Sequence, residues 1–222
     1  MEKRLIITID GPAGSGKSTV SRMLAKKLSY LYLDTGALYR ALAYRAAREG
    51  ISSTTPAAVA DLCKRCEINL RRIDDELRVF VDADDVTEKI RTEAIGLLAS
   101  TLSAMPAVRA ALLPVQRNAG KDGGVIAEGR DMGTVVFPDA DVKFFLEADA
   151  PERVRRRFRE LVMRGEKVDY PSLEKDMLFR DRQDRERAIA PLKMPEGAIM
   201  IDSTQLNIDA VLEAMLAAMI RQ

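Results

Sequence analysis

The feature that most constrains the fold of this chain is a glycine-rich loop directly behind its first apolar run. The loop reads GPAGSGKST over residues 11–19, and the run before it is LIITI at 5–9. The spacing G-x4-G-K-S lets backbone amides turn inward around phosphate oxygens at the N-terminus of the next helix. A glycine turn without a ligand is the alternative, but the apolar run before the loop and the helical pattern after it favour phosphate binding. The sequence therefore predicts a strand, a phosphate-binding loop and a helix in succession.

The side chains of this loop predict how a triphosphate is held. Lys17 is expected to reach the β- and γ-phosphates, and the Ser18 hydroxyl is a candidate ligand of Mg²⁺. The backbone of the loop is expected to surround the phosphates of ATP. The predicted ATP-binding residues are Gly11, Pro12, Ala13, Gly14, Ser15, Gly16, Lys17, Ser18 and Thr19.

Short apolar runs alternate with helical patterns along most of the chain. Strands are predicted at 5–9, 30–33, 125–127, 142–146 and 198–201. Apolar residues recur at helical spacing in Val20, Met23, Leu24 and Leu28 and again in Ile208, Val211, Leu212, Met215 and Met219. This alternation favours an α/β fold with a parallel sheet and helices on both faces. Ligands of such sheets bind beyond the carboxyl ends of the strands, where three of the predicted strands run into DGPAGSG, DTG and EGRDMG.

One region departs from the parallel pattern. Residues 67–86, EINLRRIDDELRVFVDADDV, alternate apolar and polar side chains, with the Asp74-Asp75 pair in the middle. Such alternation around a turn pair predicts a β-hairpin. We therefore expect a small antiparallel subdomain inserted into the parallel fold.

Composition excludes several classes of protein. The 222 residues fit one domain, and 35 Lys and Arg against 34 Asp and Glu disfavour a dedicated binder of nucleic acid or membrane surface. No apolar run approaches the roughly eighteen residues of a membrane helix, and the N-terminus lacks the apolar segment of a signal peptide. We therefore expect a cytoplasmic protein without nucleic-acid or membrane partners.

The chain contains few kinds of reactive side chain. The chain has no histidine, so its usual general base and commonest transition-metal ligand are missing. Cys63 and Cys66 have the spacing of half a zinc site, but the chain has no other cysteine to complete it, so we interpret them as structural thiols. The chemistry must use carboxylates, lysine, arginine, backbone amides and a hard metal ion.

Two charged segments follow predicted strands. In DTGALYR at 34–40, Thr35 and Arg40 could bind an anion at a helix N-terminus, or the segment could be a plain N-cap. In EGRDMGTVVFP at 128–138, the adjacent Arg130 and Asp131 point in different directions, so each could hold a different group. A structural ion pair is the alternative there.

Arginines gather in the last third of the chain. Residues 153–187 hold 12 Lys and Arg and 8 Asp and Glu, which suits either a nucleic-acid patch or a mobile arginine lid over a triphosphate. Arg180, Asp184 and Arg187 share one face of a predicted helix, a pattern suited to a phosphate and a sugar hydroxyl. A solvated, salt-bridged helix face is the alternative.

Taken together and in order, GPAGSGKST, DTGALYR, DVTEKIRT, GRDMGTVVFPDADVKFFLEA and RDRQDRERAIAPL resemble the bacterial cytidylate kinase family. The resemblance runs essentially end to end. It implies a three-layer α/β/α nucleoside monophosphate kinase fold of the phosphate-loop class, with a five-stranded parallel core. The segment near 62–102 resembles the insert of this family's bacterial branch. As one kinase domain over 1–222, the chain is expected to divide into a core (about 1–33, 103–150 and 171–222), a monophosphate-binding subdomain (about 34–102) and a lid (about 151–170).

The resemblance also implies roles for individual residues. Thr35, Arg40 and Arg130 would hold the acceptor phosphate, Ser100, Arg109 and Asp131 would face the cytosine, Arg180 and Asp184 would hold the sugar, and Arg187 would lie at the base or the phosphate. Arg153 to Arg157 would close over ATP, and the expected catalytic residues are Lys17, Arg130 and Arg157. One departure is local, because some relatives carry glycine where this chain has Ser18.

The reaction implied is ATP + CMP (or dCMP) → ADP + CDP (or dCDP) with Mg²⁺, carried out by a monomer on small-molecule substrates. The lack of histidine is compatible with it, because phosphoryl transfer depends on positioning and charge neutralisation more than on a strong base. Two alternatives remain open at the level of sequence. One is a kinase of the same scaffold that acts on AMP, UMP, dTMP or shikimate. The other is a GTPase-like or RNA-associated switch, which would need a guanine-reading N-K-x-D that this chain lacks.

Overall fold

The core of the protein is a parallel β-sheet. The structure, a computed structural model, describes residues 4–74 and 76–220. Five strands, β1 (Ile6–Asp10), β2 (Leu31–Asp34), β6 (Val125–Gly129), β7 (Val142–Glu147) and β8 (Ile199–Asp202), pair in the order β2-β6-β1-β7-β8. All four pairings are parallel. The expected parallel core is confirmed, and each predicted strand lies within two residues of its observed bounds.

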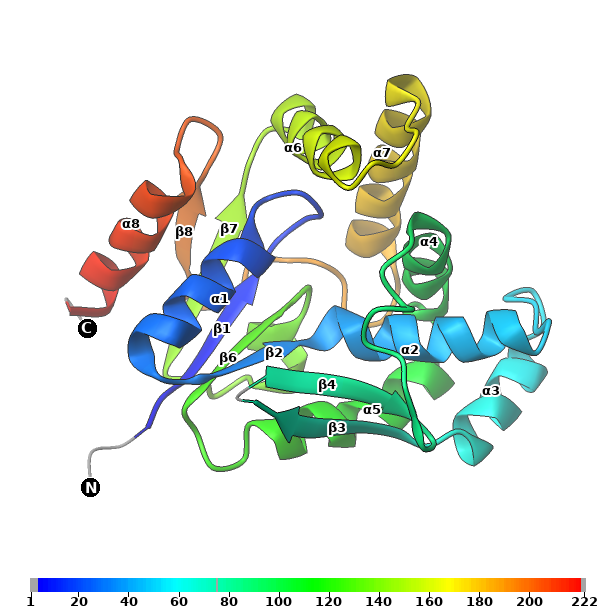
Figure 1. Cartoon of the computed structure of the whole chain (residues 1–222). Helices are drawn as coiled ribbons and strands as arrows, with labels where there is room; N and C mark the ends of the chain where they lie inside the picture. The colour runs from blue at the N-terminus through cyan, green and yellow to red at the C-terminus, as the bar shows by residue number, and fades with distance from the viewer. Residues whose placement is uncertain (1–3, 75, 221–222) are drawn as a thin grey trace.

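Alternate residues of the strands face opposite sides of the sheet. On one side, two helices, α1 (Lys17–Leu28) and α8 (Ile208–Ile220), pack on the sheet and on each other (Figure 1). Their buried residues Val20, Leu24, Val211 and Met215 form one apolar cluster with Ile7, Ile9, Ile126, Val142, Phe144 and Leu146 of the strands. The helical spacing of the sequence predicted that the four helix residues face a core.

The other side of the sheet is covered by less regular elements. Leu33, Val125 and Ala127 pack against the short π-helical turn η1 (Met132–Val136), against α5 (Pro106–Ala119) and against the inserted hairpin. Helical cover on both faces was expected. Here the short turn η1, which contacts β1, β6 and α5, forms part of that layer.

The inserted segment is antiparallel, as predicted. Strands β3 (Ile68–Ile73), β4 (Glu76–Val81) and the short β5 (Asp84–Asp85) form a separate sheet in the order β3-β4-β5. The register pairs Ile68 with Val81 and Ile73 with Glu76. Of the turn pair predicted between the strands, Asp74 has φ +50° and Asp75 lies outside the described residues.

Two helical groups stand beside the sheet. Helices α2 (Thr35–Arg48), α3 (Pro56–Arg65), α4 (Glu93–Leu102) and α5 share an apolar cluster with the β3–β4 hairpin. Helices α6 (Ala150–Met163) and α7 (Tyr170–Glu186) pack through Val154, Leu161, Leu173 and Met177. Figure 1 shows α6 and α7 beyond the carboxyl ends of β1 and β7, where the glycine-rich loop also lies.

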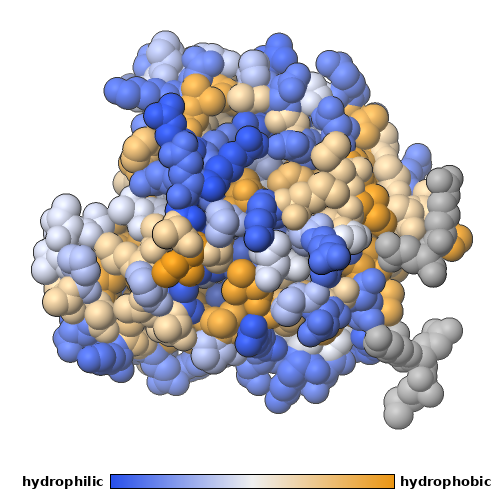
Figure 2. Space-filling view, turned by 180° about the vertical axis from the view of Figure 1, so that it is seen from behind, coloured by the Kyte–Doolittle hydropathy of each residue, from blue (hydrophilic) through white to orange (hydrophobic). Residues whose placement is uncertain are grey.

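The surface seen from behind is mixed in character. Hydrophilic side chains predominate along its top and bottom, and apolar ones gather in separate patches between them (Figure 2). In the described part of the chain, no single helix is long and apolar enough to cross a membrane. The pair α4 and α5 passes that test only when joined across a bend of 104°, and both helices contribute to the apolar cluster around α2.

Candidate active site

The glycine-rich loop connects β1 to α1 with a backbone that side chains would not tolerate. Gly11 has φ +150°, and a Cβ atom there would lie 2.0 Å from the carbonyl oxygen of Leu146. Gly16 is the N-cap of α1 with φ +91°, in the left-handed region. Glycine is therefore required at both positions, and the loop can follow a path that leaves its amides at the start of the helix.

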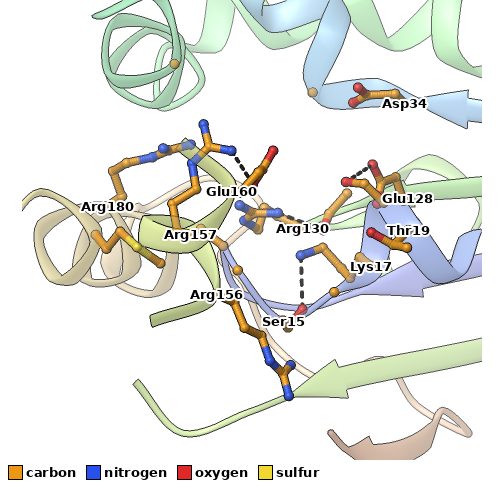
Figure 3. Close-up of a pocket in the computed structure, with 18 of the residues that line it drawn as sticks. Ser15, Lys17, Thr19, Asp34, Glu128, Arg130, Arg156, Arg157, Glu160 and Arg180 are labelled. Atoms are coloured by element: carbon orange, nitrogen blue, oxygen red, sulfur yellow. Dashed lines mark hydrogen bonds and ion pairs between the residues drawn. The ribbon is translucent and has the colours of Figure 1, made fainter. Parts of the chain in front are cut away.

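Lys17 is held inside this loop. Its Nζ donates to the carbonyl oxygen of Pro12 at 2.5 Å and lies 3.3 Å from Ser15 Oγ (Figure 3). The side chain is buried, and burial together with the nearby Arg130 cation lowers the pKa of Lys17 to about 7. An anion placed beside Nζ would favour the charged form and raise this pKa. The position of Lys17 therefore suits the binding of a phosphate group.

One continuous pocket of about 900 Å³ runs from this loop toward α2, α4 and α7. Twelve Lys and Arg residues and seven Asp and Glu residues line it, so its wall carries an excess of positive charge. The predicted site residues brought together there are Ala13, Gly14, Ser15, Gly16, Lys17, Ser18, Thr19, Thr35, Arg40, Ser100, Arg109, Arg130, Asp131, Arg157, Arg180, Asp184 and Arg187. Gly11 and Pro12 do not line the pocket; they shape the loop behind it.

Arg130 and Asp131 contact separate partners, as their adjacency in the sequence predicted. Arg130 Nε donates to Asp184 Oδ2 at 2.7 Å. Asp131 forms an ion pair with Arg109 and lies 3.4 Å from Arg187 Nη2. Both carboxylates are buried, so these ion pairs offset part of the cost of removing them from water.

The Asp131 end of the pocket is a network of polar side chains. Arg109 Nη1 donates to the Ser103 carbonyl oxygen at 3.3 Å, and Arg187 Nη1 donates to Ser103 Oγ at 3.1 Å. Ser100 Oγ donates to Gln183 Oε1 at 3.4 Å. Burial raises the pKa of the Asp131 carboxyl, against the opposing attraction of the two guanidiniums. A planar group entering here would meet donors and an acceptor on one edge.

The helix expected to carry Arg180, Asp184 and Arg187 on one face ends earlier than predicted. Helix α7 stops at Glu186, and Arg187 is its C-cap with φ −60° and ψ 138°. The chain turns here: the Leu192 amide donates to the Asp184 carbonyl oxygen at 2.6 Å, and Ala190 has φ +49°. The one-face prediction is wrong for Arg187, although its Nη1 still lies 3.8 Å from Asp184 Oδ1.

Arg180 is one of the arginines that line the pocket. It is largely buried, and in the described part of the chain its Nε has no hydrogen-bond partner. Burial and the neighbouring Arg130 lower the pKa of Arg180. Figure 3 shows Arg180 and Arg157 on the side of the pocket opposite Glu128 and Asp34, with Arg130 between them.

The segment at the start of α2 matches both interpretations of DTGALYR in part. Asp34 is the N-cap of α2, and its Oδ1 accepts from the Ala37 amide at 3.1 Å. The Arg40 guanidinium lies 2.6 Å from Asp34 Oδ2, and Thr35 Oγ1 donates to the Glu128 carbonyl oxygen at 2.7 Å. Arg40 nevertheless lines the pocket, so a phosphate could compete with Asp34 for it.

The arginines of α6 differ in their surroundings. Arg153 is buried: it pairs with Asp181 at 2.6 Å and donates to the Ala13 carbonyl oxygen at 3.0 Å. It fastens the glycine-rich loop to α7, so the expectation that it closes over ATP is wrong. Arg155 is more than half exposed and does not line the pocket, so its expected place over ATP stays a prediction.

Three other arginines of α6 line the pocket: Arg156, Arg157 and Arg159. Arg156 Nη2 donates to the Ser203 carbonyl oxygen at 2.6 Å. Arg157 is held by Glu93 at the start of α4 and by Glu160, 2.5 Å away. Arg157 thus joins α6 to α4 across the mouth of the site.

Several lining residues were not identified from the sequence. Glu128 is the second-last residue of β6, and its Oε1 accepts from Ser18 Oγ at 2.7 Å. Glu93 pairs with Arg157, and Arg91 and residues 203–208, which follow β8, also line the pocket. The sequence did contain a signal for Glu128, because this charged residue directly follows the apolar run VIA.

The cysteines lie away from this site. Cys63 and Cys66 are free thiols packed against the apolar cluster around α2, as the structural interpretation predicted. Burial raises the pKa of the Cys66 thiol to about 11. Among the residues described, no group of three His, Cys, Asp or Glu side chains is arranged to hold a metal ion.

A parallel sheet whose first strand enters a glycine-rich phosphate loop, with a lysine and an arginine-lined pocket at its carboxyl edge, defines a phosphate-loop kinase. The solved structure of a gluconokinase from Sinorhizobium meliloti shares this fold, with TM-score 0.51 and 16% identity over 100% of this chain and 94% of that one. The chain belongs to the cytidylate kinase family, whose model matches residues 7–221.

Relatives named cytidylate kinase are similar over nearly the whole chain. One from Citrifermentans bemidjiense is 53% identical over 96% of this chain and 92% of its own length. One from Bacillus subtilis is 44% identical over 98% of this chain and 97% of its own. The resemblance of the motifs to this family is confirmed, and the protein is an enzyme with kinase activity.

Proposed function

We propose that this enzyme transfers the γ-phosphoryl group of ATP to CMP and dCMP, with Mg²⁺, in pyrimidine nucleotide metabolism. The observation that carries the proposal is the single pocket. It joins the phosphate loop and Lys17 at one end to the buried Asp131–Arg109 pair at the other. A donor nucleotide and an acceptor nucleotide can therefore meet between Lys17 and Arg130 without bulk water separating them.

At the donor end, the loop amides and Lys17 bind the β- and γ-phosphates of ATP. The available oxygen donors suit Mg²⁺: the Ser18 hydroxyl lies beside the buried Glu128 carboxylate, whose Oε2 has no hydrogen-bond partner among the described residues. When bound, the ion neutralises charge that develops on the transferred phosphoryl group. Thr19 and the rest of residues 11–18 orient the phosphates.

At the acceptor end, arginines replace water around the monophosphate. Arg130 and Arg40 hold the acceptor phosphate with Thr35 at the mouth of α2. Arg180 and Asp184 hold the sugar, and the Arg130–Asp184 ion pair fixes the phosphate and sugar sites relative to each other. Arg157 leaves Glu93 when ATP binds and contributes positive charge at the reacting phosphates.

The base is selected at Asp131. An ionised carboxylate only accepts hydrogen bonds, so it can accept from the exocyclic amine of cytosine but repels the oxygen that uracil carries there. Arg109 and Ser100 supply donors to the remaining edge, and Arg187 holds Asp131 in place. We also propose that residues 34–102 and about 151–170 move as a monophosphate-binding subdomain and a lid that close over the substrates.

A coupled assay of ADP release across acceptors tests this proposal. With ATP and Mg²⁺, CMP and dCMP should give the highest kcat/KM, well above UMP, AMP, dTMP and shikimate. A higher kcat/KM with AMP, dTMP or shikimate would overturn the proposal.

A further inference from the structure

Arg153 is a buried cation next to the phosphate loop that the roles above leave unexplained. It is only 4% exposed, and it lines a second cavity of about 530 Å³ and not the main pocket. A buried guanidinium costs free energy unless its charge and its donors have partners. Well-packed apolar side chains often join two helices at no greater cost than a buried ion pair. The contacts of Arg153 therefore call for a reason beyond the packing of α6 on α7.

The guanidinium of Arg153 holds three oxygens from three segments. Its Nε donates to the Ala148 carbonyl oxygen at 2.9 Å. Its Nη1 donates to the Ala13 carbonyl oxygen at 3.0 Å and lies 2.6 Å from Asp181 Oδ2. Ala148 precedes α6 and Asp181 belongs to α7, whereas Ala13 belongs to the phosphate loop. One of the three contacts thus reaches the segment that is expected to bind ATP.

The contact with Ala13 fixes the direction of the next amide. The peptide bond between Ala13 and Gly14 is planar, and in a trans peptide the C=O and the N–H point in opposite directions. Arg153 binds the carbonyl oxygen from outside the main pocket, whereas Gly14 lines that pocket. The Gly14 N–H is therefore turned toward the pocket, where a phosphate oxygen can accept from it.

The carbonyl group just before this one is held in a different way. The Pro12 oxygen accepts from Lys17 Nζ, which lines the pocket, so a phosphate can compete for this lysine. Arg153 lies outside the pocket, so its bond to Ala13 can persist when the ligand binds. The backbone also packs closely here, because a Cβ atom at Gly14 would lie 2.8 Å from the carbonyl oxygen of Arg153. Helix α6 therefore supports the loop at this one peptide through both its backbone and its side chain.

We propose that Arg153 is a positioning residue of the phosphate loop, which holds the Ala13 carbonyl oxygen away from the ligand so that the Gly14 amide faces the phosphates of ATP. The inference rests on the proposed binding of ATP by this loop. Without Arg153, the peptide could rotate and turn the partial negative charge of its oxygen toward the phosphates. Asp181 supports the arrangement, because its carboxylate compensates the buried charge of Arg153.

The alternative is that Arg153 only ties α6 to α7 through Asp181. The two roles differ in what happens at single amides of the loop. A positioning role affects Gly14 and spares Gly16, the N-cap of α1, whose carbonyl oxygen accepts from the Val20 amide. Loss of a structural tie would affect both amides alike, or neither.

NMR of the loop amides during titration with ADP and Mg²⁺ separates these roles, with affinity measured by calorimetry. The test compares the wild-type enzyme, Arg153→Met and the control Arg185→Met, which removes an exposed arginine of α7 that pairs with Glu147. In wild type, the amide protons of Gly14 and Gly16 should move downfield as phosphate oxygens accept from them. In Arg153→Met at saturating ADP, the Gly14 shift should be lost and the Gly16 shift kept. ADP affinity should fall about tenfold, as expected for one hydrogen bond to a charged group. Arg185→Met should match wild type throughout.

Two further variants keep the test decisive. In Asp181→Asn the side-chain oxygen can still accept from Arg153, so this variant should keep the Gly14 shift while its free energy of unfolding in urea falls. If Arg153→Met fails to fold by circular dichroism, the double variant Arg153→Met with Asp181→Leu takes its place. It leaves no unpaired buried carboxylate at this position and should still lose the Gly14 shift.

Three results would overturn the inference: an unchanged Gly14 shift in the folded variant, equal losses at Gly14 and Gly16, or a loss in Asp181→Asn as complete as in Arg153→Met. Because no acceptor is present, a failure of the proposed CMP specificity would leave the outcome unchanged. A wild-type enzyme that does not bind ADP would contradict the proposed ATP site, and the inference with it.

Discussion

Nucleotide binding should transfer a proton to Lys17. In the free protein burial lowers the pKa of Lys17 to about 7, with the Arg130 cation adding to the effect. A bound diphosphate places negative charge beside Nζ and raises this pKa again. At pH 8 Lys17 is then mostly neutral before binding and charged after it, so binding should take up most of a proton. At pH 6 the uptake by Lys17 should be much smaller.

The same shift fixes the sign of the pH dependence of affinity. Above pH 7 the complex holds one more proton than its components, so ADP affinity should fall as pH rises, approaching tenfold per unit. Each such unit corresponds to about 1.4 kcal/mol of binding free energy. Below pH 7 the dependence should flatten, because Lys17 is already charged in the free protein.

Titration calorimetry of ADP in buffers of different ionisation enthalpy measures the proton uptake directly. Lys17→Met is the matched variant, since it keeps the length and removes the titrating group; it should bind ADP more weakly and with no uptake at pH 8. Lys17→Ala should also lower kcat by orders of magnitude, since loss of one such electrostatic donor costs about 3–4 kcal/mol. No uptake by wild type at pH 8, or equal uptake at pH 6 and pH 8, would refute the reasoning.

Three further predictions concern carboxylates. Asp184→Ala should weaken CMP and dCMP binding far more than ATP binding, measured by calorimetry, because Asp184 pairs with Arg130 and is proposed to hold the sugar. Asp131→Asn should lower the CMP:UMP ratio of kcat/KM about tenfold or more. The loss should lie mainly in CMP use, because the amide replaces one acceptor oxygen with a donor, and that donor can bond the oxygen of uracil. Asp10→Ala should lower the free energy of unfolding in urea by about 2–4 kcal/mol, because Asp10 accepts from the Met132 and Gly133 amides at 2.8 Å each.

Each of these has an outcome that contradicts it. A loss of ATP affinity with intact CMP affinity in Asp184→Ala would mean that the α7 site is misassigned. Parallel loss of CMP and UMP turnover in Asp131→Asn would make Asp131 part of the scaffold. If Asp10→Ala changes the free energy of unfolding by less than about 0.5 kcal/mol, the Asp10 carboxylate does not stabilise η1.

The parts of the fold that local sequence determines were predictable. The phosphate loop depends on glycines at fixed spacing between an apolar run and a helix, and Gly11 and Gly16 have the backbone angles that the motif demands. The hairpin at 67–86 follows from alternation of side chains, which the register of Ile68 with Val81 confirms. These features require no knowledge of distant residues.

The side-chain pairings of the site could not be predicted from the sequence, because they depend on packing between distant segments. Arg109 and Asp131 are 22 residues apart, and nothing in either segment indicates their ion pair. The arginines of α6 are similar by type, yet helix register buries Arg153 and exposes Arg155. The end of α7 depended on a turn at 187–192, where the Leu192 amide replaces a helical donor to Asp184. Tertiary contacts decided each of these.

The central claim is that the pocket transfers a phosphoryl group to a cytidine nucleotide chosen at its Asp131 end. The most direct measurement is a competition in which ATP, Mg²⁺ and equal concentrations of CMP and UMP are mixed with the enzyme and the nucleotides are separated by chromatography at early times. CDP should form first, in step with ADP, while most UMP remains. Formation of UDP at the same rate as CDP, or of ADP without either diphosphate, would contradict the claim.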